Sequence, residues 1–191
     1  MKKKFVEVVI RGVTPLLVHK FSDGATVGAS TRRVASAPPN PRAEATKAAY
    51  VRANGEFYIS AFCIGGTMKA AGGGHKMKGS RKSLRFVVPS AVMVKTDTIT
   101  ILRDDLKPYT DFEVDARPVT IPATKGRIMR YRPRWDTWKL RFGLEIDEDM
   151  LNLDDAQMLL TEGGASYGIG DFRPEKSGPF GRFVIESWQV S

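Results

Sequence analysis

The sequence contains one cysteine, Cys63, and only two histidines, His19 and His75. A single cysteine excludes an internal disulfide and a cysteine-rich zinc site, and two histidines are too few for a histidine-based metal cage. Also missing is any apolar run near the roughly 20 residues that a membrane-spanning helix needs. We therefore expect a protein without a metal, without another cofactor and without a membrane partner.

Signals for targeting and for nucleotide hydrolysis are absent as well. The basic start at Met1 imitates a signal peptide, but residues 5–11 are too few and too charged for its apolar core. The glycine-rich stretch at 168–182 lacks the Gly-Lys-Ser/Thr ending of a nucleotide-binding P-loop, and it precedes a predicted strand where a P-loop precedes a helix. These absences predict a soluble cytoplasmic protein and disfavour ATP hydrolysis.

Positive charge is what the sequence has in excess. The chain of 191 residues carries a formal net charge of +9, its pI is about 9.8, and 42% of its residues are hydrophobic. The apolar share is enough for the core of a single domain, which we expect to span residues 1–191. Because surplus positive charge destabilises a folded protein through self-repulsion, it usually serves an anionic partner.

Hydrophobic periodicity predicts an α+β fold, with one antiparallel sheet and a layer of helices on one of its faces. Helices are expected at 42–52, 60–71 and 153–162, the first capped by Asn40 and the second by Ser60. Strands are expected at 5–13, 56–59, 91–102, 112–121, 127–135, 138–146 and 182–190. The pair 127–135 and 138–146 is predicted to form a hairpin closed at Asp136 and Thr137. The remaining segments predict a mobile loop at 21–39, a flexible basic loop at 72–86 and a protruding arm at 110–138.

The positive charge is concentrated in two clusters. The first, residues 69–85, holds no acid and six basic residues: Lys69, Lys76, Lys78, Arg81, Lys82 and Arg85. The second, residues 125–141, holds seven basic residues, Arg127 among them, against one acid. By contrast, residues 142–172 hold eight acids and no base, so an acidic face is available to meet the basic face of a neighbouring subunit.

Within the second cluster, arginines alternate with aromatic residues. In an extended strand Arg130, Arg132 and Arg134 lie on one face, while Tyr131 and Trp135 lie on the other. Guanidinium groups match phosphate geometry and aromatic rings stack on unpaired bases, so the pattern favours a single-stranded nucleic acid. The alternative for the rings is that they enter the core.

A glycine-rich stretch at 168–182 adds a third candidate surface. Its glycines include Gly168, Gly170, Gly178 and Gly181, and its basic residues are Arg173, Lys176 and Arg182. Exposed backbone amides beside basic side chains suit phosphate groups. A tight structural connection is the alternative for this stretch.

Three spaced motifs resemble the RAMP superfamily of CRISPR-associated RNA-binding proteins. They are Thr-Pro-Leu-Leu-Val at 14–18, Tyr-Ile-Ser-Ala-Phe-Cys-Ile-Gly-Gly-Thr-Met-Lys at 58–69, and Gly-Pro-Phe-Gly-Arg-Phe at 178–183. The resemblance implies an RRM/ferredoxin-like fold and a protein that coats a guide RNA. It implicates Lys69, Arg173, Lys176 and Arg182 in binding. The segments Arg-Tyr-Arg-Pro-Arg-Trp and Gly-Ile-Gly-Asp-Phe-Arg-Pro-Glu-Lys are similar to those of free-standing bacteriophage proteins.

These observations predict a non-catalytic protein that binds single-stranded DNA or RNA and oligomerises along it as a filament or ring, with phage DNA replication or recombination as one setting. One alternative is a CRISPR-type guide-RNA subunit or an endoribonuclease of the same superfamily. For such catalysis Asp23 and His19 are the candidates, since both lie in or near the loop after the first strand. Another alternative is a module whose charge serves an acidic protein partner.

Overall fold

The computed structural model describes residues 2–20, 40–120 and 125–191. The predicted mobile loop at 21–39, and Asp23 with it, lies outside these residues. In the described ranges no helix is long and apolar enough to cross a membrane.

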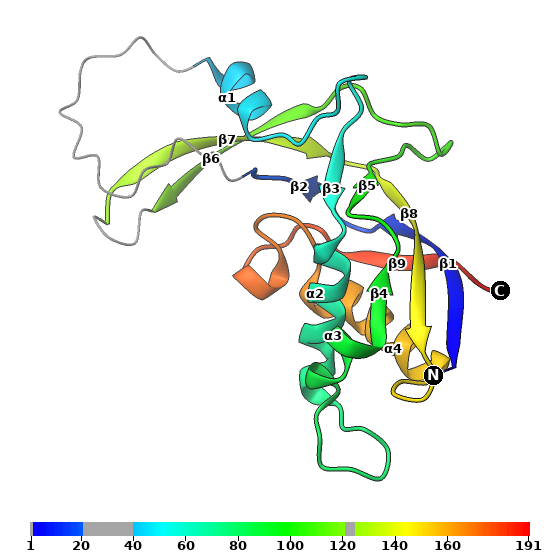
Figure 1. Cartoon of the computed structure of the whole chain (residues 1–191). Helices are drawn as coiled ribbons and strands as arrows, with labels where there is room; N and C mark the ends of the chain where they lie inside the picture. Colours follow the sequence, from blue (N-terminus) through cyan, green and yellow to red (C-terminus); the bar gives the residue numbers. More distant parts are fainter. Residues whose placement is uncertain (1, 21–39, 121–124) are drawn as a thin grey trace.

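A four-stranded antiparallel sheet forms the centre of the molecule (Figure 1). Its strands, in spatial order, are β4 (Val92–Val94), β8 (Lys139–Asp147), β1 (Lys3–Gly12) and β9 (Phe183–Val190). Alternation along β1 and β8 turns Val6, Val8 and Leu144 to one face, where they are buried. The helices α2 (Phe62–Ala71) and α4 (Leu153–Glu162) pack on that face through residues such as Met68 and Leu159. This is the expected RRM/ferredoxin-like α+β fold.

Two smaller sheets lie beside the first. One contains β2 (Leu16–Leu17), β7 (Arg127–Trp135) and β6 (Glu113–Thr120), and the other pairs β3 (Tyr58–Ser60) with β5 (Thr98–Thr100). The β6–β7 hairpin projects from the body (Figure 1) and is called the arm here. The remaining helical elements are α1 (Pro41–Lys47), α3 (Val88–Ala91), η1 (Gly72–Gly74), η2 (Leu84–Phe86), η3 (Gly163–Tyr167) and η4 (Pro174–Lys176).

The predicted hairpin at 127–135 and 138–146 is wrong. Strand β7 pairs with β6 and β2, whereas β8 pairs with β1 and β4. The two tryptophans that flank the Asp136–Thr137 link pack in different places, Trp135 against Phe57 and Phe112 and Trp138 against Phe183. Each indole also donates a hydrogen bond to a different backbone carbonyl, that of Asp111 or that of Thr14. The link therefore carries the chain from one sheet into another.

Other boundaries differ from the sequence prediction for local reasons. The strand expected at 91–102 is divided into β4 and β5, which pair with β8 and β3 respectively. Asn40 caps α1 as predicted, accepting hydrogen bonds from the Arg42 and Ala43 amides, but α1 ends at Lys47. Ser60 does not cap α2, which begins after Ala61 without a side-chain cap. Helix α4 has the predicted bounds.

Candidate nucleic-acid interface

The glycine-rich loop, residues 168–182, is fixed to the start of the chain by backbone hydrogen bonds. The Gly181 amide donates to the Pro15 carbonyl at 2.8 Å, and the Asp171 amide donates to the Leu17 carbonyl at 2.8 Å. A Cβ added to Gly178 would lie 1.8 Å from the Phe172 carbonyl oxygen, so the chain crosses itself too closely for any side chain. The loop is thus a compact, defined structure.

A hollow of about 470 Å³ lies beside this loop. One side is the end of β2 with His19, another is the β3–α2 junction, and the third is the loop itself. The lining residues are Val18, His19, Tyr50, Ile59, Ser60, Phe62, Cys63, Gly66, Thr67, Gly168, Ile169, Gly170, Asp171, Arg173 and Glu175. Two of the three motifs, at 14–18 and 58–69, therefore meet the first half of the glycine-rich loop around one space, whereas the motif at 178–183 does not line it. Only four of these residues, His19, Gly168, Gly170 and Arg173, were candidates from the sequence.

Two titratable groups in the hollow have shifted pKa values. Burial lowers the pKa of His19 below its usual 6.5, and the nearby Arg130 and Arg132 lower it further, while Asp171 opposes them. His19 is therefore neutral at pH 7. Burial raises the pKa of the Cys63 thiol to about 12, so Cys63 is protonated and is no nucleophile at neutral pH.

The arginine face of the arm is turned toward the glycine-rich loop. Arg132 is only 4% exposed, and its Nε lies 3.0 Å from Oδ2 of Asp171. The Arg134 Nε donates to Asp136 at 2.5 Å. Guanidinium groups also lie over rings of the loop, Arg132 over Phe172 and Arg134 over Phe180. At the base of the arm these arginines thus join β7 to the glycine-rich loop, with Arg132 buried and Arg134 partly exposed.

The aromatic face of the arm belongs to the core. Trp135 is 2% exposed, and Tyr131 is half-buried against the core cluster. Of the two alternatives for Trp135, stacking on bases or filling the core, the structure selects the core. Farther out on the arm, Arg127 is exposed, as are Ile128 and Met129.

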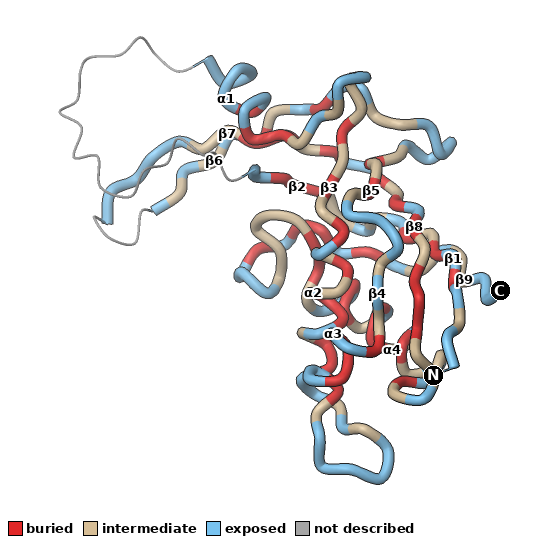
Figure 2. The backbone as a smooth tube through the Cα atoms, in the orientation of Figure 1, coloured by how far each residue is buried: buried red, intermediate tan, exposed pale blue. Residues whose placement is uncertain are grey.

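The first basic cluster is exposed at the other end of the molecule. Residues 75–83, called the basic loop here, are closed at their base by a bridge between Lys76 and Ser83. Lys76, Lys78, Arg81 and Lys82 are exposed on this loop, and Lys69 and Arg85 are exposed beside it. In Figure 1 the arm and the basic loop project from opposite ends, and the glycine-rich loop lies between them. Figure 2 shows that both projections are largely exposed.

The basic residues of the glycine-rich loop divide in the same way. Arg173 is held by Glu175 and by the Gly170 carbonyl, to which its Nη1 donates at 3.0 Å. Arg182 donates to the Ala165 carbonyl at 2.6 Å, with its side chain on the surface. Lys176 is exposed. The loop therefore offers Lys176 and Arg182 to a partner more readily than Arg173.

Sequence reasoning missed the groups that organise this region. The rings of Phe172 and Phe180 lie under guanidinium groups of the arm. Asp115, which is 4% exposed, accepts a hydrogen bond from the Arg117 Nε at 2.7 Å. The missed signal is Asp171, an acid within a glycine-rich stretch whose other charged residues are mostly basic. Asp115 gives no such signal, because Asp111 and Glu113 lie close to it in the sequence.

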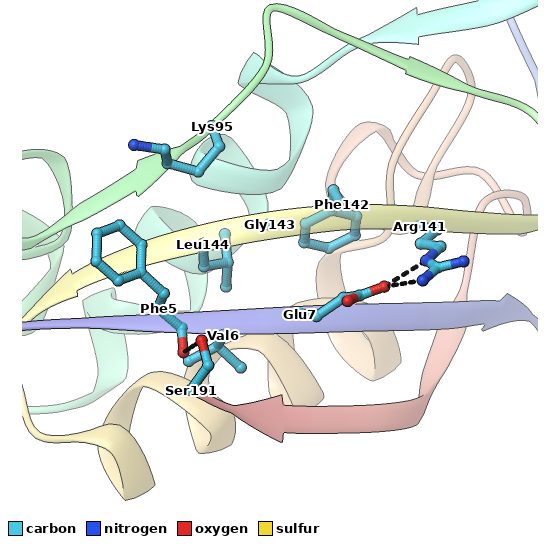
Figure 3. A pocket seen from close by; sticks show the side chains of 9 residues that line it. All are labelled: Phe5, Val6, Glu7, Lys95, Arg141, Phe142, Gly143, Leu144 and Ser191. Carbon is cyan, nitrogen blue, oxygen red and sulfur yellow. Dashed lines mark hydrogen bonds and ion pairs between the residues drawn. The ribbon is translucent and has the colours of Figure 1, made fainter.

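The open face of the four-stranded sheet has a hollow of its own, of about 370 Å³. Figure 3 shows the side chains that line it. Phe5 is 44% exposed at its edge. The cations there are already paired: Arg141 with Glu7, and Lys95 with Glu145 at 3.2 Å. Because these charges cancel locally, this face attracts a polyanion less than the basic loop does.

Comparison with known proteins identifies the fold. The sequence matches no protein-family model and no curated protein. Among solved structures the chain is similar to a chain in the cryo-EM structure of the type III-B Cmr-beta bound to cognate target RNA, with a TM-score of 0.55 and 15% identity. That match covers 99% of this chain and 61% of the other, so this chain spans less than two thirds of its neighbour.

A second solved structure has nearly the same extent. Cmr6 from Pyrococcus furiosus matches with a TM-score of 0.50 and 11% identity, over 96% of this chain and 99% of that one. At such low identity these likenesses establish the fold alone.

Proposed function

We propose that this protein binds a single-stranded nucleic acid, RNA in the first instance, along its phosphate backbone and without cleaving it. The observation that carries the proposal is the position of the hollow, between two exposed basic projections. A strand that contacts both the arm and the basic loop has to cross the glycine-rich loop and α2. The neighbouring Cmr-beta structure was solved bound to target RNA, which makes RNA the first strand to test.

The same arrangement supports assembly along the strand. Helix α4 has Asp154 and Asp155 in its first turn and no basic residue in its last. One copy's acidic surface and the next copy's basic surface attract each other at physiological salt. We therefore propose side-by-side copies on one strand, with a bound mass that rises stepwise with oligonucleotide length. A single-stranded DNA in phage replication or recombination is the competing ligand.

Binding is expected to depend strongly on salt. For single strands the slope of log K against log salt is about −0.7 for each phosphate contact. Replacing Lys76, Lys78, Arg81 and Lys82 by alanine should therefore flatten the slope by up to about 3 and weaken all sequences alike. Fluorescence anisotropy with labelled single-stranded RNA, single-stranded DNA and duplex measures this.

The matched control is Lys107→Ala, an exposed lysine whose partner Asp105 lies two residues away in the same turn. It should leave the slope unchanged. An unaltered slope in the quadruple variant, or equal affinity for duplex, would contradict the proposal. RNA that stays intact in the same samples fits a non-catalytic protein, whereas cleavage that disappears in His19→Ala would make it an endoribonuclease.

His19 should report the arrival of a phosphate group. In the free protein its pKa lies below 6.5 because of burial and of Arg130 and Arg132, with Asp171 opposing. A phosphate in the hollow adds negative charge beside the imidazole and should raise this pKa. Since the folded-state pKa is below the unfolded value, folding stability should fall as the pH drops through 6.5, and bound RNA should reduce that fall. NMR titration of the His19 ring protons, with and without RNA, measures the pKa, and denaturant unfolding between about pH 5 and pH 8 on the same two samples measures the stability.

A further inference from the structure

Phe62 is the most exposed large hydrophobic side chain in the described part of the chain. It is the first residue of α2 and is 81% exposed. Its neighbour Cys63 packs against the core, so the helix itself is firmly seated. A single exposed hydrophobic side chain is common on protein surfaces, so the inference depends on what surrounds this ring.

The ring lies on a ridge between two hollows. One is the hollow beside the glycine-rich loop, and the other, of about 790 Å³, lies between α2, α3 and β4. Phe62 and Gly66, one helical turn apart, are the two residues that line both. A strand that crosses α2 from one hollow to the other therefore passes over this ring.

Gly66 leaves the Phe62 ring uncovered on the side that faces the next turn of α2. On a helix the side chain at i+4 lies next to the side chain at i, and position 66 has none. A Cβ at Gly66 would meet nothing within 4 Å, so internal packing does not require glycine here. Glycine inside a helix is less favourable than alanine, which suggests that the absent side chain serves an approaching ligand.

One exposed cation lies on the same helical face as the ring. Lys69 follows Phe62 by seven residues, about two helical turns, and lines the larger hollow, which also has the acids Asp97, Glu145 and Asp147 in its wall. Arg173 lines the smaller hollow but is held by Glu175. A base that meets the ring can therefore place a flanking phosphate near Lys69.

We propose that Phe62 stacks on one unpaired base of the bound strand as it crosses α2, with Gly66 providing the space. This inference rests on the proposed function and adds a contact to the base, beyond those to the phosphates. Stacking is tolerant of sequence because every base has a flat face. The protein would then distinguish unpaired from paired strands without distinguishing one base from another.

The test is a thermodynamic cycle in which the ring and the bases are removed separately and together. Affinity is measured for the wild type and for Phe62→Ala, each with a single-stranded RNA and with a strand of equal length and charge that lacks its bases. Phe62→Ala should weaken binding to the normal strand roughly tenfold, the order expected for one lost stack. On the strand without bases the two proteins should bind equally. Phe86→Ala, which removes another exposed ring (65%) that lines neither hollow, should change nothing.

Gly65 and Gly66 supply a second, matched comparison. Both glycines are helical, and a Cβ at either position would have no atom within 4 Å. Because alanine favours the helix more than glycine does, alanine at either position should raise Tm by roughly a few degrees. Only Gly66→Ala should weaken binding, because only Gly66 lines both hollows. Phe62→Trp adds a tryptophan whose emission is the difference between the spectra of the variant and the wild type. This added emission should be quenched when the normal strand binds.

The outcomes separate the inference from the function beneath it. If the wild type binds RNA with a salt-dependent affinity and Phe62→Ala binds equally well, the stacking is wrong and the function stands. An equal loss on both strands also overturns the stacking. A change of native mass in Phe62→Ala without nucleic acid would assign the ring to a protein interface instead. No binding by the wild type would remove both proposals.

Discussion

Gly181→Ala is expected to dismantle the glycine-rich loop, lowering the free energy of unfolding by about 3 kcal/mol and abolishing strand binding. Gly181 has φ of +71°, and a Cβ there would lie 1.8 Å from the Ile169 carbonyl oxygen. The left-handed conformation costs alanine roughly 1 kcal/mol. The clash forces the backbone apart and breaks the hydrogen bonds from Gly181 to Pro15 and from Ile169 to Gly181, at about 1 kcal/mol each.

A second glycine isolates the steric part of this effect. Gly55 has φ of +84°, but a Cβ there would meet nothing within 4 Å. Gly55→Ala should therefore cost only the conformational part, about 1 kcal/mol, and should leave RNA binding intact. Denaturant unfolding measures the two stabilities, and limited proteolysis locates the opening. Equal losses in the two variants would show that crowding at Gly181 is not what holds the loop.

Arg132→Ala and Arg127→Ala should have opposite effects, although both arginines belong to β7. Arg132 is 4% exposed, and its removal leaves Asp171 without its partner and opens a gap under the loop. We expect a loss of about 2 to 3 kcal/mol of stability, less than for a fully buried pair because Asp171 is one third exposed. Arg127 is exposed, so its replacement should change stability by less than about 0.5 kcal/mol.

Binding should follow the reverse order. Arg127→Ala should weaken RNA binding and flatten the salt slope by about 0.7, because one phosphate contact is lost. Arg132→Met, which keeps the side-chain stem without the charge, should retain the salt slope of the wild type as long as the protein is folded. Chemical denaturation and salt-dependent anisotropy on the same samples measure both properties. A salt slope that falls in Arg132→Met but not in Arg127→Ala would place the strand at the base of the arm.

The local features of the fold were readable from the sequence because their causes are local. The Asn40 cap needs only the next two amides, and the bounds of α4 follow from Asn152 at its start and glycine at its end. The α+β class follows from the order of strands and helices, and the resemblance of three motifs indicated the RRM/ferredoxin-like architecture. The strand after Arg182 was likewise expected from alternation alone.

Strand pairing could not be read in the same way. Residues 127–135 and 138–146 are both good strands separated by two residues, which is the usual pattern of a hairpin. The pairing is decided by partners far away in the sequence, Glu113–Thr120 for β7 and Lys3–Gly12 for β8. Trp135 and Trp138 enforce the choice, since the hydrogen bonds of their indoles end on Asp111 and Thr14.

The sequence by itself determined the charge, the Asn40 cap, the bounds of α4 and the alternation of arginines with rings along β7. Alternation separates two faces of a strand, but which face meets solvent depends on what packs against it. Only the tertiary structure brought Asp171, Phe172 and Phe180 under the arginines, which made Arg132 a buried ion-pair partner. It also left Phe62 in water, because α2 turns Ile64 and Met68 to the core and Phe62 away from it.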